Sequence, residues 1–249
     1  MYVVYRWQEV SRIPSHDPIF DLSLHSLSKL QPYRDQEYIK RMVPDMYVFR
    51  LAHRCITQWA KSSGVYSSKF GLLGGIHITM MLCRLHQLIH EKFGRVTVPE
   101  LVAMFFHHYA HFDWKNNMVV SPGVQTRYRR SLREPMVILT VHAPTINVAR
   151  AVTTPSLRTI VSAFKRAEEL MGEDGAKWSN ILNDISISHN NQTGAEKFLA
   201  AYKSYIKVNV QYWGPSPTQA SSLIGWLESR FFRLLNGKLD LASKLWVIF

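Results

Sequence analysis

The residues of this chain most suited to chemistry lie in one stretch, from Arg50 to Leu82. Its segment SSGVYSSKFG interrupts a helical apolar pattern and separates two predicted helices. Gly74 and Gly75 open the second helix, whose first backbone N–H groups are free to bind an anion or a nucleotide. Tyr66 offers a ring on which a base could stack. Spacing alone, however, favours a simpler interpretation, in which two packed core helices are joined by a turn.

Metal binding is the second chemistry that the residue types suggest. His107 and His111 lie four residues apart on a predicted helix, residues 97–112, so both could face one ion. Neither an HExxH pattern nor a nearby cysteine accompanies them. We therefore expect a polar or partly buried helix face here rather than a metal site.

Helices and a few strands must position these residues. Helical spacing of apolar residues predicts helices on both sides of the glycine-rich loop, at residues 97–112 and after Pro155. The run PMVILTVHAP predicts a strand, and the C-terminal region reads as a strand (YIKVNVQYW), a helix from Pro217 and a strand (LWVIF). Near the N-terminus, YVVYRW and IFDLSLHSL read as two short extended runs, and the second alternates as strands do, with Asp21 on its polar face. The fold class is therefore α+β.

Composition points to an acidic partner. Lys and Arg number 30 against 18 Asp and Glu in 249 residues, a net charge of +12, so nucleic acid is the first candidate. The apolar share of 47% allows a sizeable core. The longest apolar run is far shorter than the roughly 20 residues of a membrane span, and we expect no membrane partner. Cys55 and Cys83 fall on apolar helix faces and are expected to be buried free thiols.

Several strings, in order along nearly the whole chain, resemble one family. WAKSSGVYSSKFGLLGGIHITM is similar to the segment of eukaryotic nuclear poly(A) polymerases that reads WAK..(I/V)YSN..GFLGGVSWAM. MVPDMYVFRLAHRCITQWAK, PMVILTVHAPTINVARAVT, AAYKSYIKVNV and WLESRFFRLL resemble further segments of the same family. The resemblance implies a template-independent nucleotidyltransferase that adds AMP from ATP to RNA 3′ ends with two Mg²⁺ or Mn²⁺ ions.

The resemblance also implies site residues. Asp21 occupies the position of the third carboxylate that holds the catalytic metal ions, although a solvated strand Asp is the alternative. The nucleotide-binding positions are Lys61, Tyr66, Gly74, Gly75, Ile76 and Asn147. The expected RNA-binding residues, which could equally be solvated surface charges, are Arg127, Arg129, Arg130, Arg133, Lys203 and Lys207.

Three domains follow from the resemblance. Residues 1–33 are expected to be a remnant of the nucleotidyltransferase palm, residues 34–190 the central helical domain, and residues 191–249 a truncated RRM-like RNA-binding domain. The aromatic signature of true RRM domains is absent, so base stacking on its sheet is not expected.

The chain departs from the family in ways that leave its function open. Thr57 stands where the family has a lysine that meets the triphosphate, and the family's Asn-bearing loop and the "DxD" element have no match. We therefore expect the isolated chain to bind RNA without extending it. The leading interpretation is the central and RNA-binding part of a nuclear polyadenylating enzyme, with 3′-end processing proteins as partners. The alternatives are a non-catalytic RNA-binding or assembly module and a partner-binding scaffold.

Overall fold

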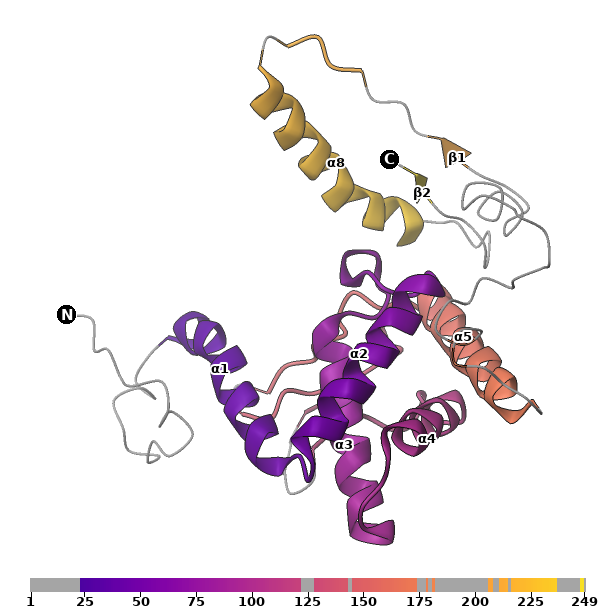
Figure 1. Cartoon of the computed structure of the whole chain (residues 1–249). Helices are drawn as coiled ribbons and strands as arrows, with labels where there is room; N and C mark the ends of the chain where they lie inside the picture. The colour runs from indigo at the N-terminus through magenta and orange to yellow at the C-terminus, as the bar shows by residue number, and fades with distance from the viewer. Residues whose placement is uncertain are drawn as a thin grey trace.

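The structure is a computed structural model that describes residues 23–121, 128–142, 145–173, 178, 181, 206–207, 211–214, 216–236 and 247–248. Its helices are α1 (Leu24–Met42), α2 (Met46–Ser62), the 3₁₀ helix η3 (Ser68–Phe70), α3 (Gly75–Phe93), α4 (Val98–Ala110), α5 (Thr154–Gly172) and α8 (Pro217–Asn236). The strands β1 (Ile206–Lys207) and β2 (Val247–Ile248) pair in parallel, with Ile206 opposite Val247. Helices α2 and α3 lie at the centre, with α4 and α5 on one side and α1 on the other (Figure 1).

Helix α1 corrects one prediction. The Ser23 hydroxyl accepts a hydrogen bond from the backbone N–H of Ser26 at 3.3 Å and caps the helix. The strand predicted over residues 19–27 is therefore wrong from Leu24 onward, and the predicted domain border after residue 33 falls inside the same helix. The alternating pattern was too short to outweigh a serine cap followed by a helix of 19 residues. Asp21 lies outside the described residues.

Helix α1 is tied to the body of the molecule by polar contacts. The Gln31 side-chain amide donates to the carbonyl of His142 at 2.8 Å. The carboxylate of Asp35, which is nearly buried, accepts from the backbone N–H of His142 and lies 3.0 Å from its ring Nδ1. Buried polar groups are normally paired in this way, since leaving one unpaired costs about 1–3 kcal/mol.

Helices α2, α4 and α5 share an aromatic core. The Trp59 ring lies 4.6 Å from that of Phe106 and 5.4 Å from that of Phe164, on which it stacks at an interplanar angle of 17°. Tyr109 is fully buried, and its hydroxyl donates to the carbonyl of Met81 at 2.7 Å. Burying each large apolar side chain stabilises the fold by about 1.5–3 kcal/mol. These contacts fix the C-terminal end of α2, from which the candidate site begins.

The predicted strand at PMVILTVHAP forms only isolated bridges and joins no sheet among the described residues. Val119 and Ile138 form one isolated bridge, and Leu139 and Asn147 form another. Met136 through Leu139 are buried, so this segment passes through the core beneath the helices.

The C-terminal elements follow the predicted order of strand, helix and strand. Helix α8 begins at Pro217, as the sequence predicts, and lies beside η3 (Figure 1). The RRM-like assignment for this region stays a prediction. Among the described helices, none combines the length and the apolar character needed to span a membrane.

Candidate nucleotide-binding site

Backbone hydrogen bonds hold the loop between α2 and α3. The N–H of Val65 donates to the carbonyl of Ala60, and the N–H of Leu73 donates to the carbonyl of Val65, both at 2.9 Å. Tyr66 and Leu73 form a parallel bridge. Val65 and Leu73 are buried, so the loop is anchored from below while Tyr66 remains half-buried at the surface.

The Tyr66 side chain lies between the facing ends of the two helices. Its hydroxyl is 3.6 Å from the position that a Cβ atom on Gly75 would take. The Nζ of Lys61 is 5.5 Å from the centre of the Tyr66 ring, a distance at which an exposed cation and a ring attract by about 0.5–1 kcal/mol. Ile76, in the first turn of α3, is 42% exposed. The structure thus brings together Lys61, Tyr66, Gly75 and Ile76 from the predicted set.

His77 fixes the start of α3. The N–H of Gly74 donates to His77 Nδ1 at 3.1 Å, so we assign the ring proton to Nε2, which lies 2.9 Å from the carbonyl oxygen of Val148. Burial lowers the pKa of His77 and keeps the ring neutral at pH 7. The imidazole therefore connects the helix start to the loop that follows Asn147. No pattern in the sequence marked His77 for this role.

Acid should weaken this connection. The unfolded chain protonates histidine near pH 6.5, whereas burial lowers the pKa of folded His77, so the unfolded state binds more protons as the pH falls. The free energy of unfolding should therefore decrease below about pH 6.5, with less decrease in His77→Gln. Urea titrations at several pH values measure both slopes. The variant keeps some pH dependence because burial also lowers the pKa of His53, His86 and His108. Identical slopes for parent and variant would contradict the assignment.

Gly71 lets the loop that carries Ala151 pack closely against the loop between α2 and α3. Its φ is +72°, in the left-handed region, and a Cβ atom on it would fall far inside contact distance of the Ala151 carbonyl oxygen. Only glycine fits both the conformation and the space. This close approach places the loop that carries Arg150, which is exposed, beside the loop that carries Tyr66.

Asn147 is committed to hydrogen bonds within the protein. Its Oδ1 accepts from the N–H groups of Ile138 at 3.0 Å and Ala149 at 2.9 Å. Its Nδ2 donates to the Glu134 carboxylate at 3.1 Å and to the carbonyl of Met136 at 3.0 Å. These four bonds use the normal capacity of the amide. The predicted nucleotide contact by Asn147 stays a prediction, and its observed contacts hold the loop next to Arg150.

The predicted RNA-binding arginines differ in their surroundings. Arg129 and Arg133 are exposed, whereas Arg130 is half-buried. The Arg130 guanidinium donates to the backbone carbonyls of Trp114, Lys115, Asn117, Glu134 and Pro135. It therefore joins two loops and has little capacity left for a phosphate. Arg127 and Lys203 lie outside the described residues, and only the backbone of Lys207 is described.

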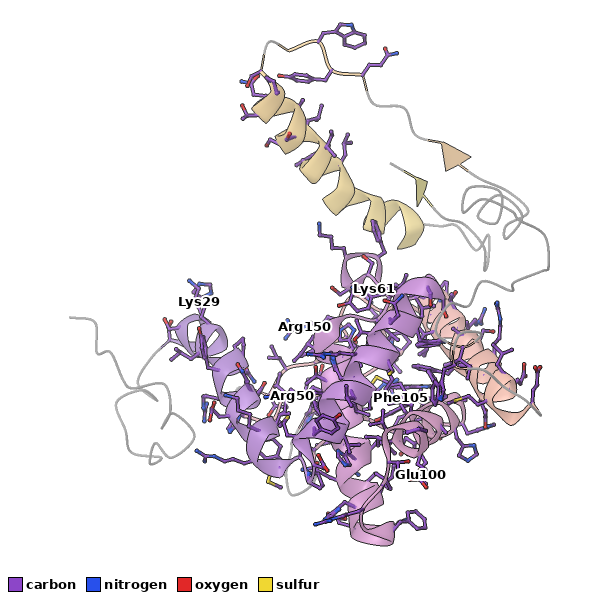
Figure 2. The ribbon with its side chains drawn as sticks, in the orientation of Figure 1. Lys29, Arg50, Lys61, Glu100, Phe105 and Arg150 are labelled. Atoms are coloured by element: carbon purple, nitrogen blue, oxygen red, sulfur yellow. The ribbon has the colours of Figure 1, made fainter. Side chains whose placement is uncertain are left out.

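A basic stripe on α2 was missed in the sequence. Arg50, Arg54 and Lys61 are four and seven residues apart, so they lie within about 40° of one another around the helix, and all three are exposed. Figure 2 shows Arg50 and Lys61 on α2, with Arg150 between them in this view. Arg50 and Arg54 form no ion pair within the described part of the chain, and there Arg150 interacts electrostatically with Glu134 without forming one. The spacing could have revealed the stripe, because the three basic residues fall on the face of α2 opposite the buried Trp59.

Thr57 lies between these basic residues on the same helix. Its hydroxyl is buried and has no hydrogen-bond partner among the described residues. Thr57 therefore supplies no charge to the site, in contrast to Arg54 and Lys61 on either side of it.

The chain matches a family model described as the poly(A) polymerase central domain over residues 48–184, which include most of α2, the Tyr66 loop, α3, α4 and α5.

The chain is also similar to proteins that are named poly(A) polymerases. The chain is 26% identical over 225 residues to nuclear poly(A) polymerase 1 of Arabidopsis thaliana, covering 84% of this chain and 29% of that protein. It is 26% identical over 260 residues to poly(A) polymerase PAPa of Candida albicans, covering 97% of this chain and 44% of that protein. A poly(A) polymerase of Dictyostelium discoideum is 25% identical over 232 residues, which cover 88% of this chain and 26% of that protein. The chain thus spans less than half the length of these relatives.

Proposed function

The chain belongs to the poly(A) polymerase family through its central domain, and from this premise we propose that it forms the nucleotide- and RNA-facing part of an enzyme that adds AMP from ATP to RNA 3′ ends. The name of the Arabidopsis relative supports a nuclear location. The proposed partners are ATP, the RNA 3′ end and 3′-end processing proteins.

One observation carries the proposal. An aromatic ring, an ammonium group and a glycine-led helix start meet at Tyr66, Lys61 and Gly75. A helix N-terminus favours negative charge because its first N–H groups have no partner within the helix. An adjacent ring adds a surface for a base, so the arrangement suits a ligand that carries both a base and phosphates.

The residues of the site would take different parts of the ligand. The Tyr66 ring would stack on adenine, and the N–H groups of Gly75 and Ile76 would face phosphate oxygens. Lys61 and Arg150 would neutralise the triphosphate. His77 and Gly71 act indirectly, since they hold the two loops in place without presenting a free group.

Divalent metal ions, when bound, would supply charge for the leaving pyrophosphate and activation of the attacking hydroxyl. Asp21, the predicted metal carboxylate, lies outside the described residues, so its role rests on the sequence alone. The residues of the described site bind and orient the nucleotide. We expect a polypeptide of these 249 residues to bind RNA without extending it, since Asp21 is its sole assigned metal carboxylate.

A second function is favoured by Thr57. The family lysine at this position is replaced by a buried hydroxyl, for which the described part of the chain offers no hydrogen-bond partner. A lost charged contact costs about 1.5–3 kcal/mol. The chain would then be a non-catalytic RNA-binding module, which predicts RNA binding without ATP binding.

Arg50 and Arg54 of the basic stripe should bind the RNA backbone. Each neutralised phosphate of a single strand contributes about 0.7 to the slope of log affinity against log salt concentration. The double variant Arg50→Gln/Arg54→Gln should therefore flatten this slope by about 1.4 for an oligo(A) strand. A salt titration followed by fluorescence anisotropy measures it.

A matched control separates location from net charge. Lys92 and Arg95 are also exposed, and they lie near the end of α3 that is about 27 Å from Gly75 along the helix axis. Lys92→Gln/Arg95→Gln removes the same charge and should leave the slope unchanged. Equal flattening by both double variants would mean that RNA responds to net charge and not to the stripe.

A further inference from the structure

A cluster of two histidines and one glutamate joins α4 to α5, away from the nucleotide site. His107 and His111 lie one turn apart on α4, and Glu168 faces them from α5. The Glu168 carboxylate is 2.6 Å from His107 Nδ1 and 3.0 Å from His111 Nε2. One candidate ligand atom from each side chain lies within 4.8 Å of the other two. The helices run side by side (Figure 1), so the cluster bridges two elements that are far apart in the sequence.

The ligand set matches one class of metal. Two imidazole nitrogens and a carboxylate suit zinc and its neighbours, whereas Mg²⁺ prefers oxygen ligands throughout. A tetrahedral zinc ion at about 2.1 Å from each ligand needs ligand atoms roughly 3.4 Å apart. The observed separations of 2.6 and 3.0 Å must therefore widen by less than about 1 Å.

The surroundings permit that adjustment. The side chains of His107 and His111 are 73% and 60% exposed, and that of Glu168 is 27% exposed. Exposed side chains can change rotamer at little cost, and solvent can supply the fourth ligand. Beneath the cluster, Phe105 and Phe164 pack against each other with ring centres 5.8 Å apart, which keeps the two helices in register.

We infer that His107, His111 and Glu168 form a binding site for a divalent transition-metal ion, with zinc as the favoured ion. His107 Nδ1, His111 Nε2 and a Glu168 oxygen are the protein ligands, and water is the fourth. Without metal, the two ring nitrogens face the carboxylate as hydrogen-bond donors. On metal binding, each proton leaves to solvent or moves to the other nitrogen of its ring, so binding weakens in acid. The bound ion links α4 to α5.

Calorimetric titration of Zn²⁺ into the full chain, with any affinity tag removed, tests the site. The parent should bind one equivalent that Glu168→Gln, His107→Gln and His111→Gln each weaken at least tenfold. Removing groups that merely support a metal ligand costs about 10–100-fold, so losing a ligand should cost no less. Zn²⁺ should also raise the melting temperature of the parent but not of Glu168→Gln, since a ligand specific to the native state stabilises it.

Two neighbours provide matched controls. Glu169 is the exposed residue next to Glu168 on α5, and His90 is an exposed histidine on α3. Glu169→Gln and His90→Gln should bind Zn²⁺ like the parent. Co²⁺ should give an intense four-coordinate visible spectrum in the parent that Glu168→Gln abolishes, and circular dichroism of the metal-free variants checks folding.

Two results would overturn the assignment. One is a parent that binds no Zn²⁺ at neutral pH. The other is Zn²⁺ binding that survives in folded Glu168→Gln and His111→Gln, which would mean that the ion sits elsewhere in the chain.

Discussion

Replacing Gly71 with alanine should destabilise the protein by roughly 2–5 kcal/mol. An alanine held at the Gly71 φ of +72° is disfavoured by about 1–2 kcal/mol. Its Cβ would also push against the backbone carbonyl of Ala151, and overpacking of this kind costs about 1–3 kcal/mol. Because this contact holds the Tyr66 loop against the Arg150 loop, ATP affinity of the folded protein should fall as well.

Denaturant unfolding of Gly71→Ala measures the first effect, and calorimetry with ATP measures the second. Gly172→Ala is the control, since nothing lies within 4 Å of a Cβ placed at Gly172. It should lose no stability and keep its ATP affinity. A Gly71→Ala protein as stable as the parent would mean that the two loops are not held by this contact.

Replacing Asn147 with aspartate should cost about 3–5 kcal/mol at pH 7. The Asn147 side chain is 1% exposed, and its Nδ2 lies 3.1 Å from the Glu134 carboxylate. An aspartate loses both donated hydrogen bonds and puts a second negative charge beside the first. Its pKa should rise in the folded state, so the charge part of the loss is absent below the unfolded pKa of about 3.9, grows as the pH rises, and is complete above the raised folded pKa.

Urea titrations at several pH values measure this loss, with Asn117→Asp as the control. Asn117 is exposed, and its substitution should change stability by less than about 0.5 kcal/mol. The experiment also separates two roles for Asn147. If Asn147 contacts the nucleotide directly, the variant should lose ATP affinity and keep normal stability. If its main role is the observed set of hydrogen bonds, the variant should lose stability.

The sequence predicted the elements of the site well because local patterns determine them. The apolar spacing of α2 and α3 and the glycines between them predicted two helices and a tight loop at the observed place. The helix predicted from Pro217 likewise begins at the observed start of α8. Helix α1 was missed because a brief alternation of polar and apolar residues resembled a strand.

Polar contacts between distant segments could not be predicted in this way. Arg130 has the residue type of a phosphate ligand, yet its partners are backbone carbonyls up to 16 residues away. Glu168 meets His107 and His111 across 57 to 61 residues, so the sequence showed the two histidines of that cluster but not the glutamate. Hydrogen-bond partners of this kind depend on tertiary packing, which spacing along one helix does not encode.

The measurement that tests the central proposal most directly is calorimetric titration of ATP into the parent, Tyr66→Ala and Tyr47→Ala. Tyr47 is 73% exposed in the first turn of α2, at the end of that helix away from the Tyr66 loop, so its loss should leave ATP affinity unchanged. Stacking on a base is worth about 1–3 kcal/mol, so Tyr66→Ala should bind ATP roughly ten- to hundredfold more weakly. Equal ATP affinity in the parent and Tyr66→Ala, or a parent that binds oligo(A) but no ATP, would contradict a nucleotide site between α2 and α3.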